Sequence, residues 1–145
     1  MTYSFGRRSH SKKITCHRDL QLILDEAIKV VDFTILEGAR TLETQQEYFA
    51  QGKSKLDGVN KKSKHQVSDE QPLSMAVDIA SYPIDWNDKF RFAFLAGVMK
   101  GVATRLLEDG KISHKLRWGG DWDSDNNFKD QTFFDLPHFE LIKVK

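Results

Sequence analysis

The sequence has little of what would mark a disulfide-rich, membrane-spanning or nucleic-acid-binding protein. Cys16 is its only cysteine, which excludes an internal disulfide and suits a reducing compartment. No apolar run approaches the ~20 residues of a membrane span, and the polar, basic stretch 1–14 lacks the apolar core of a signal peptide. Lys and Arg total 22 against 21 for Asp and Glu, so no net field attracts a nucleic acid. We therefore expect a protein made in a cytoplasm, without stable membrane insertion and without nucleic-acid binding.

The composition that is present is typical of a folded domain. Hydrophobic residues make up 39% of the 145 positions and charged residues 30%. This length suffices for one core and is short for two, so we expect a single domain over 1–145.

Apolar periodicity and turn residues predict an α+β fold, a small antiparallel sheet packed with helices. Phe90, Phe94, Val98, Val102 and Leu106 are expected to form the buried stripe of the longest helix. The expected helices cover 18–31, from Thr41 or Thr44 to Gly52, and from Asn87 or Asp88 to about Glu108; the expected strands cover 33–36, 75–80, 116–118 and 139–144, and 53–71 is expected to be a loop.

Two carboxylates are out of keeping with their surroundings. Asp78 interrupts the apolar run MAVDIA, and Asp135 lies three positions before His138, at the start of the last expected strand. A buried carboxylate needs a partner, and His65 and His138 are the histidines next to these features. From spacing alone, a zinc site and a satisfied core histidine with a capping Asp both remain open. The other histidines, His10, His17 and His114, are interpreted as surface residues.

Three short motifs resemble those of a known zinc peptidase family. Ser63-Lys64-His65, Ala76-Val77-Asp78 and the segment 135–140 (DLPHFE) are similar to the signatures of the zinc D-alanyl-D-alanine carboxypeptidase and L-alanyl-D-glutamate peptidase family. That family includes phage endolysins and vancomycin-resistance dipeptidases. Segments 38–54 (GART, Gln45, GKS) and 117–122 (RWGGDW) extend the resemblance, the latter toward the endolysin members.

The resemblance implies a Hedgehog/DD-peptidase-like fold and a role for each matching residue. It implies that His65, Asp78 and His138 bind zinc, that Asp135 is the catalytic base and that Arg40 stabilises the oxyanion. Gln45 and Ser63 would contact the substrate. Glu140, which shares a strand face with His138 under period-two alternation, would orient that histidine.

One departure from the family pattern concerns spacing. His65 and Asp78 are thirteen positions apart, and residues 69–74 form an apparent insertion between them. Asp69 or Glu70 could then compete as a metal ligand.

The function implied is that of a phage endolysin, which cleaves the L-Ala-D-Glu amide of the peptidoglycan stem peptide and lyses the host cell wall. The alternatives are a D-Ala-D-Ala carboxypeptidase or dipeptidase and a non-catalytic zinc module that binds the cell wall. An endolysin would be a monomer, made in the host bacterial cytoplasm and acting on the periplasmic cell wall. A separate pore-forming protein would release it.

A second cation is an open question. Asp121, Asp123 and Asp125 alternate as in a calcium loop, but Gly is absent at the sixth position and Glu at the twelfth. A polar turn is the favoured interpretation, with calcium as the alternative.

Overall fold

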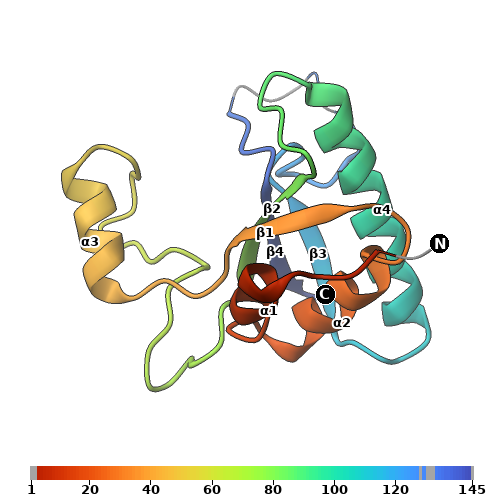
Figure 1. The fold of residues 1–145 in the computed structure, drawn as a ribbon. Helices are drawn as coiled ribbons and strands as arrows, with labels where there is room; N and C mark the ends of the chain where they lie inside the picture. The colour runs from red at the N-terminus through yellow and green to blue at the C-terminus, as the bar shows by residue number, and fades with distance from the viewer. Residues whose placement is uncertain (1–2, 128, 130–132, 145) are drawn as a thin grey trace.

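The computed structural model describes residues 3–127, 129 and 133–144, and it confirms the α+β class (Figure 1). A four-stranded sheet is packed against helices that come from both halves of the chain. The helices are α1 (Arg7–Lys13), α2 (Arg18–Ala27), α3 (Leu42–Ala50) and α4 (Lys89–Glu108), and the strands are β1 (Phe33–Glu37), β2 (Ala76–Ser81), β3 (His114–Trp118) and β4 (His138–Lys143).

The sheet has the order β1-β2-β4-β3, and every neighbouring pair is antiparallel. Asp78 of β2 is the register partner of His138 in β4, and Glu37 of β1 is the register partner of Asp78. A bulge between Ile35 and Glu37 changes the register just before Glu37. Three polar residues that are distant in the sequence therefore lie side by side across the sheet.

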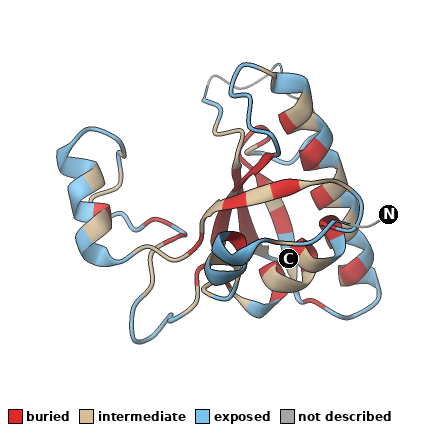
Figure 2. Cartoon of the chain, in the orientation of Figure 1, coloured by how far each residue is buried: buried red, intermediate tan, exposed pale blue. Residues whose placement is uncertain are grey.

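The hydrophobic core lies between the sheet and the layer formed by α2 and α4 (Figure 2). The stripe expected on α2 is buried as the apolar periodicity predicts, and Trp118 and Phe139 contribute the aromatic part of the core from β3 and β4. The buried α2 residues are Leu20, Ile23, Leu24 and Ala27. This layer gives the strands a fixed support.

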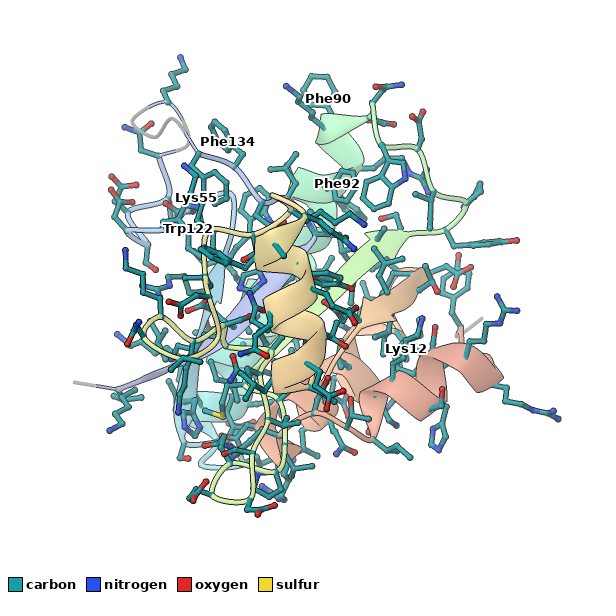
Figure 3. All side chains as sticks on the ribbon, turned by 90° about the vertical axis from the view of Figure 1, so that its left-hand side faces the viewer. Lys12, Lys55, Phe90, Phe92, Trp122 and Phe134 are labelled. Atoms are coloured by element: carbon teal, nitrogen blue, oxygen red, sulfur yellow. The ribbon has the colours of Figure 1, made fainter. Side chains whose placement is uncertain are left out.

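The stripe expected on α4 was wrong in part. Phe90 is 88% exposed and Phe94 62% exposed, and Phe90 stands clear of the ribbon at the start of the helix (Figure 3). The helix is apolar nearly all round, so spacing alone did not distinguish its two apolar faces. The buried face is Phe92, Leu95, Ala96, Met99, Ala103 and Leu106. No helix in the described part of the chain combines the length and apolar character that crossing a bilayer requires.

The N-terminal segment contains the short helix α1, which the sequence did not predict because the stretch has no apolar periodicity. Polar contacts attach it to the sheet: Ser9 Oγ lies 3.1 Å from Thr34 Oγ1 and accepts a 3.0 Å hydrogen bond from the Ile35 amide. Helix α2 ends at Ala27 rather than near Val31, where the chain turns toward β1.

Helix α3 and the loop that follows it lie apart from the α2 and α4 layer, at the left of Figure 1. Backbone hydrogen bonds join the two ends of this region to each other, from the Arg40 amide to His65 O at 2.8 Å and from the Val67 amide to Arg40 O at 2.9 Å. A further bond from the Met75 amide to Lys64 O, at 3.0 Å, closes the loop that carries the insertion. The extra residues are thereby accommodated between two fixed ends.

Gly119 allows a close backbone contact at the C-terminal turn. Its amide donates to His138 O at 2.8 Å, and its carbonyl accepts from the Asp135 amide at 2.9 Å. A Cβ atom at this position would lie 2.0 Å from Asp135 O, which is rigid backbone. Only glycine fits here without displacing the segment that connects Asp135 to His138.

We expect Gly119→Ala to lower the free energy of unfolding by about 1–3 kcal/mol, the usual cost of overpacking a tight contact. Urea denaturation of the purified variant measures it. The matched control is Gly97→Ala on α4, where a new Cβ meets no atom within 4 Å and the helix favours Ala by up to about 1 kcal/mol. Equal stability of wild type and Gly119→Ala would contradict the close contact.

Candidate metal centre

His65, Asp78 and His138 converge on one face of the sheet. His65 Nε2 lies 3.1 Å from Asp78 Oδ1 and 3.3 Å from His138 Nδ1, and the third side of this triangle, from His138 Nδ1 to Asp78 Oδ1, is 3.2 Å. Both histidines are buried. The loop before β2, the centre of β2 and the first residue of β4 each supply one member.

The outer nitrogen of each imidazole has a hydrogen-bond acceptor of its own. His65 Nδ1 donates to Gly38 O at 2.8 Å, and His138 Nε2 donates to Glu140 Oε1 at 2.8 Å. Each neutral ring carries one proton, so these bonds assign the lone pairs to His65 Nε2 and His138 Nδ1. Two lone pairs and a carboxylate oxygen therefore face one another, an arrangement that repels unless a cation or a proton lies between them.

The dimensions of this triangle fit a divalent metal ion. Zinc bonds of about 2.0–2.1 Å in tetrahedral geometry place neighbouring ligand atoms about 3.3 Å apart. The three observed distances, 3.1, 3.2 and 3.3 Å, agree with that spacing. The cluster is one of the groups in the described chain that could hold a metal ion.

The charges of the cluster favour cation binding. Burial alone would raise the pKa of Asp78, but its contacts with the His138 and His65 rings hold it well below the usual range. Burial would lower the pKa of His138, but hydrogen bonds to Asp78 and Glu140 raise it to about 9. In the metal-free protein His138 therefore holds a proton at neutral pH, and a metal ion must displace it.

Glu140 links His138 to the guanidinium of Arg117. Its Oε2 accepts from Arg117 at 2.7 Å, while Oε1 accepts from His138. Burial would raise the pKa of Glu140, but the bonds to His138 and Arg117 lower it to about 2. Trp122 packs on the His138 ring with 5.6 Å between centroids. Together these contacts fix the orientation of the imidazole.

Asp135 lies at the edge of the cluster. Its Oδ2 is 4.0 Å from His138 Nδ1, and its side chain is 40% exposed. Burial raises its pKa, and the charge of Asp78 raises it further, against the opposing charges of His138, His65 and Arg40. A carboxylate with a raised pKa, close to the centre but open to solvent, can exchange a proton with a bound water.

Arg40 approaches the centre from the segment before α3. Its side chain is only 10% exposed. Its guanidinium pairs with Glu37 and lies 4.8 Å from the centroid of the Tyr48 ring. Its NH1 donates to Gln45 Oε1 at 2.7 Å and to Ser63 Oγ at 3.4 Å.

Gln45 and Ser63, which were expected to contact the substrate, both form hydrogen bonds with Arg40. Gln45 is fully buried, and its amide nitrogen donates to Ser54 Oγ at 3.0 Å and to Leu56 O at 2.6 Å. Ser63 is buried, and its Oγ accepts from the His65 amide at 3.1 Å. Both side chains are engaged in holding Arg40 and His65, which leaves them poorly placed to meet a substrate.

His17 and His114 are not the surface residues that the sequence suggested. Both are half-buried around Asp19, whose Oδ2 lies 2.8 Å from His114 Nδ1. His17 Nδ1 accepts from the Asp19 amide at 3.0 Å and so caps α2. The ligand atoms lie close enough to hold a metal ion. However, each of these Nδ1 atoms already has a hydrogen-bond partner, so the cluster works as a polar link between α2 and β3.

The loop after β3 gathers the three carboxylates of the calcium hypothesis. Asp121, Asp123 and Asp125 lie close enough to share an ion. Asp121 is buried, and its Oδ1 has no hydrogen-bond partner within the described chain. Lys100 Nζ lies 3.5 Å from Asp121 Oδ2 and already supplies one positive charge. Asp69 and Glu70, in contrast, are exposed and lie outside the cluster around His65.

The residue that sequence reasoning missed is Glu37. It ends an apolar strand, FTILE, just as Asp78 interrupts one, so the criterion that selected Asp78 could have found it. Its partner Arg40 lies three positions along the chain.

Comparisons with known proteins identify the family of the chain. A family model described as phage L-alanyl-D-glutamate peptidase matches residues 1–142. The L-alanyl-D-glutamate peptidase of Escherichia phage T5 is 32% identical over 151 residues, which cover 98% of this chain and 100% of that protein. The crystal structure of the Serratia marcescens L-Ala D-Glu endopeptidase ChiX matches with a TM-score of 0.62 and 25% identity, over 95% of this chain and 89% of that one. The chain belongs to the phage L-alanyl-D-glutamate peptidase family.

Proposed function

We propose that the protein is a zinc-dependent endolysin that hydrolyses the L-Ala-D-Glu amide of the peptidoglycan stem peptide. The observation that carries this proposal is the convergence of His65 Nε2, His138 Nδ1 and Asp78 Oδ1 within 3.3 Å, with the Asp135 carboxylate 4.0 Å from His138. Family membership supplies the scissile bond, because the relatives are named for it.

His65, Asp78 and His138 would hold the zinc ion. Two neutral imidazoles and one carboxylate leave a net positive charge and a fourth position for water or substrate. When bound, zinc polarises the scissile carbonyl and lowers the pKa of an attacking water toward ~7.

Asp135 would take the proton of the attacking water and return it to the leaving amine. Its raised pKa suits both steps, because a carboxylate of ordinary acidity returns a proton poorly near neutral pH. Arg40 would donate a hydrogen bond to the oxygen that becomes negative in the transition state. Its guanidinium is held in place before the substrate arrives, so little reorganisation is needed.

The biological setting follows from the substrate. The stem peptide lies in the periplasmic cell wall, so a protein made in the host cytoplasm needs a separate pore-forming protein to reach it. We propose that the enzyme acts as a monomer. A D-Ala-D-Ala carboxypeptidase and a non-catalytic wall-binding zinc module remain the rival functions, and Asp135 argues against the latter, because binding alone requires no base.

The first test is digestion of purified peptidoglycan by the zinc-loaded protein and by Asp135→Asn, with new amino termini identified by mass spectrometry. We expect D-Glu amino termini with the wild type. We expect a loss of about 10²–10⁴-fold in rate with the variant, the usual contribution of a positioned general base. Zinc content, measured on both proteins, must be equal.

Each other outcome points to a specific rival. Free D-Ala as the only product would establish a carboxypeptidase. Binding of zinc and peptidoglycan without any cleavage would establish the wall-binding module. Full activity of Asp135→Asn would remove that residue from the mechanism.

Glu140→Gln should weaken zinc binding by about 10–100-fold at high pH, the usual effect of losing a carboxylate that orients a histidine ligand. The difference should shrink as the pH falls. Zinc must displace the proton on His138, and Glu140 helps to raise the pKa of His138 to about 9. The variant holds that proton less tightly, so a fall in pH opposes zinc binding less in the variant than in the wild type. Competition with a chelating dye from about pH 6 to about pH 8.5 measures both effects. A constant ratio across this range would contradict the coupling.

We also propose that Asp121, Asp123 and Asp125 bind calcium, as the alternative to a polar turn. The buried Asp121 Oδ1 without a hydrogen-bond partner in the described chain supports this, because such an oxygen is costly unless it meets a cation. The desolvation of Asp123 and its proximity to Asp125 raise the pKa of Asp123, which a bound cation would reverse. Lys100 is the observation against it.

Calcium should raise the melting temperature of the zinc-loaded protein, because a ligand that binds only the folded state stabilises it, by about 2.7 kcal/mol at 100 times Kd. Asp123→Asn with Asp125→Asn should abolish the shift, whereas the exposed Asp69→Asn should retain it. No shift with the wild type at saturating calcium would leave the loop as a polar turn.

A further inference from the structure

The carboxylate of Glu37 lies between two side chains of the Arg40 region. Its Oε1 accepts from Arg40 NH2, and its Oε2 accepts from the Tyr48 hydroxyl at 3.3 Å. The charge of Glu37 raises the pKa of the Tyr48 phenol, so Tyr48 keeps its proton and remains the donor. Glu37 therefore joins the end of β1 to α3.

The sheet determines where this carboxylate is presented. Glu37 is the last residue of β1 and is the register partner of Asp78 on β2. The bulge that precedes it shifts the alternation of the strand at this one position. Gly38, the next residue, supplies the carbonyl that holds His65. The same short segment thus fixes a histidine of the metal centre and the guanidinium beside it.

Arg40 is restrained by four side chains. Glu37 binds NH2, Gln45 and Ser63 bind NH1, and the Tyr48 ring covers one face of the guanidinium. Nε is also buried and has no partner within the described chain. The surrounding contacts therefore fix the guanidinium despite the cost of a buried donor without a partner.

We propose that Glu37 is a positioning residue that, together with Tyr48, holds the Arg40 guanidinium in the orientation in which it meets the substrate. This inference rests on the proposed function, because it assigns Glu37 a role only through the oxyanion role of Arg40. Arginine has a long, flexible side chain, and a donor misplaced by about 1 Å can cost a reaction 10²-fold. The Glu37 contact removes that freedom before the substrate binds.

A purely structural role for Glu37 predicts different behaviour. If Glu37 only neutralised a buried charge, its loss would lower stability and leave the turnover of the folded fraction unchanged. A positioning role instead predicts a fall in kcat at unchanged zinc content, and it predicts that the effect disappears when Arg40 is absent.

The experiment is a double-mutant cycle on the zinc-loaded protein with a synthetic stem peptide that contains the L-Ala-D-Glu bond. The variants are Glu37→Gln, Arg40→Ala and both together. We expect Glu37→Gln to lower kcat about 10–100-fold with KM nearly unchanged. In the Arg40→Ala background, it should change kcat less than about twofold.

Two further variants separate positioning from folding. Tyr48→Phe keeps the ring under Arg40 and removes only the hydroxyl that donates a hydrogen bond to Glu37. It should therefore fold normally and lower kcat less than Glu37→Gln does. Glu47→Gln, on the exposed side of the same helix, removes an equal charge and should retain wild-type kcat.

The outcomes are distinct. Wild-type kcat in Glu37→Gln, or losses that multiply in the double variant, would overturn the positioning role. If Glu37→Gln does not fold, wild-type kcat in Tyr48→Phe overturns it in the same way. Failure of the wild type itself to cleave this peptide would instead overturn the proposed function.

Discussion

The metal centre depends on two hydrogen bonds that point away from it. Gly38 O accepts a hydrogen bond from Nδ1 of His65, and Glu140 accepts one from Nε2 of His138, so each ring in its neutral form turns a lone pair inward. If either acceptor were absent, that ring could turn its proton toward the centre and satisfy Asp78 directly, without a cation. The acceptors are therefore part of what makes this cluster suited to a metal ion.

Both acceptors are delivered by the sheet and by tight backbone contacts. Glu140 follows His138 by two positions on β4, so strand alternation alone places the two side chains on one face. Gly38 is held against the end of α1, where a Cβ would lie 2.7 Å from Lys12 O and 2.4 Å from Thr15 Oγ1. Helix α1 therefore affects the candidate metal centre indirectly. It fixes the position of the Gly38 carbonyl, and that carbonyl determines which nitrogen of His65 carries the proton.

The sequence was most informative where a pattern was compatible with only one structure. Period-two alternation placed Glu140 beside His138, and Asp78 stood out because nothing else in the run MAVDIA is polar. It was less informative where a pattern had two solutions, as for α4, whose apolar faces are distinguished only by what packs against them. Contacts that depend on tertiary structure could not be predicted at all. The burial of Gln45 behind Arg40 and the link from His114 to Asp19, 95 positions away, belong to this class.

The loop between Lys64 and Met75 is a place where the chain can accept a change in length. One backbone hydrogen bond closes its base, and the ends lead directly to His65 and to β2, while Asp69 and Glu70 at its tip are exposed. The loop can therefore change in length at its tip while the hydrogen bond at its base is kept. Doubling the length of a flexible loop costs only about 0.6 kcal/mol in closure entropy. New segments, such as a short wall-recognition peptide, could be grafted at this tip, because His65 and Asp78 lie near the base of the loop, where the hydrogen bond from Met75 to Lys64 closes it.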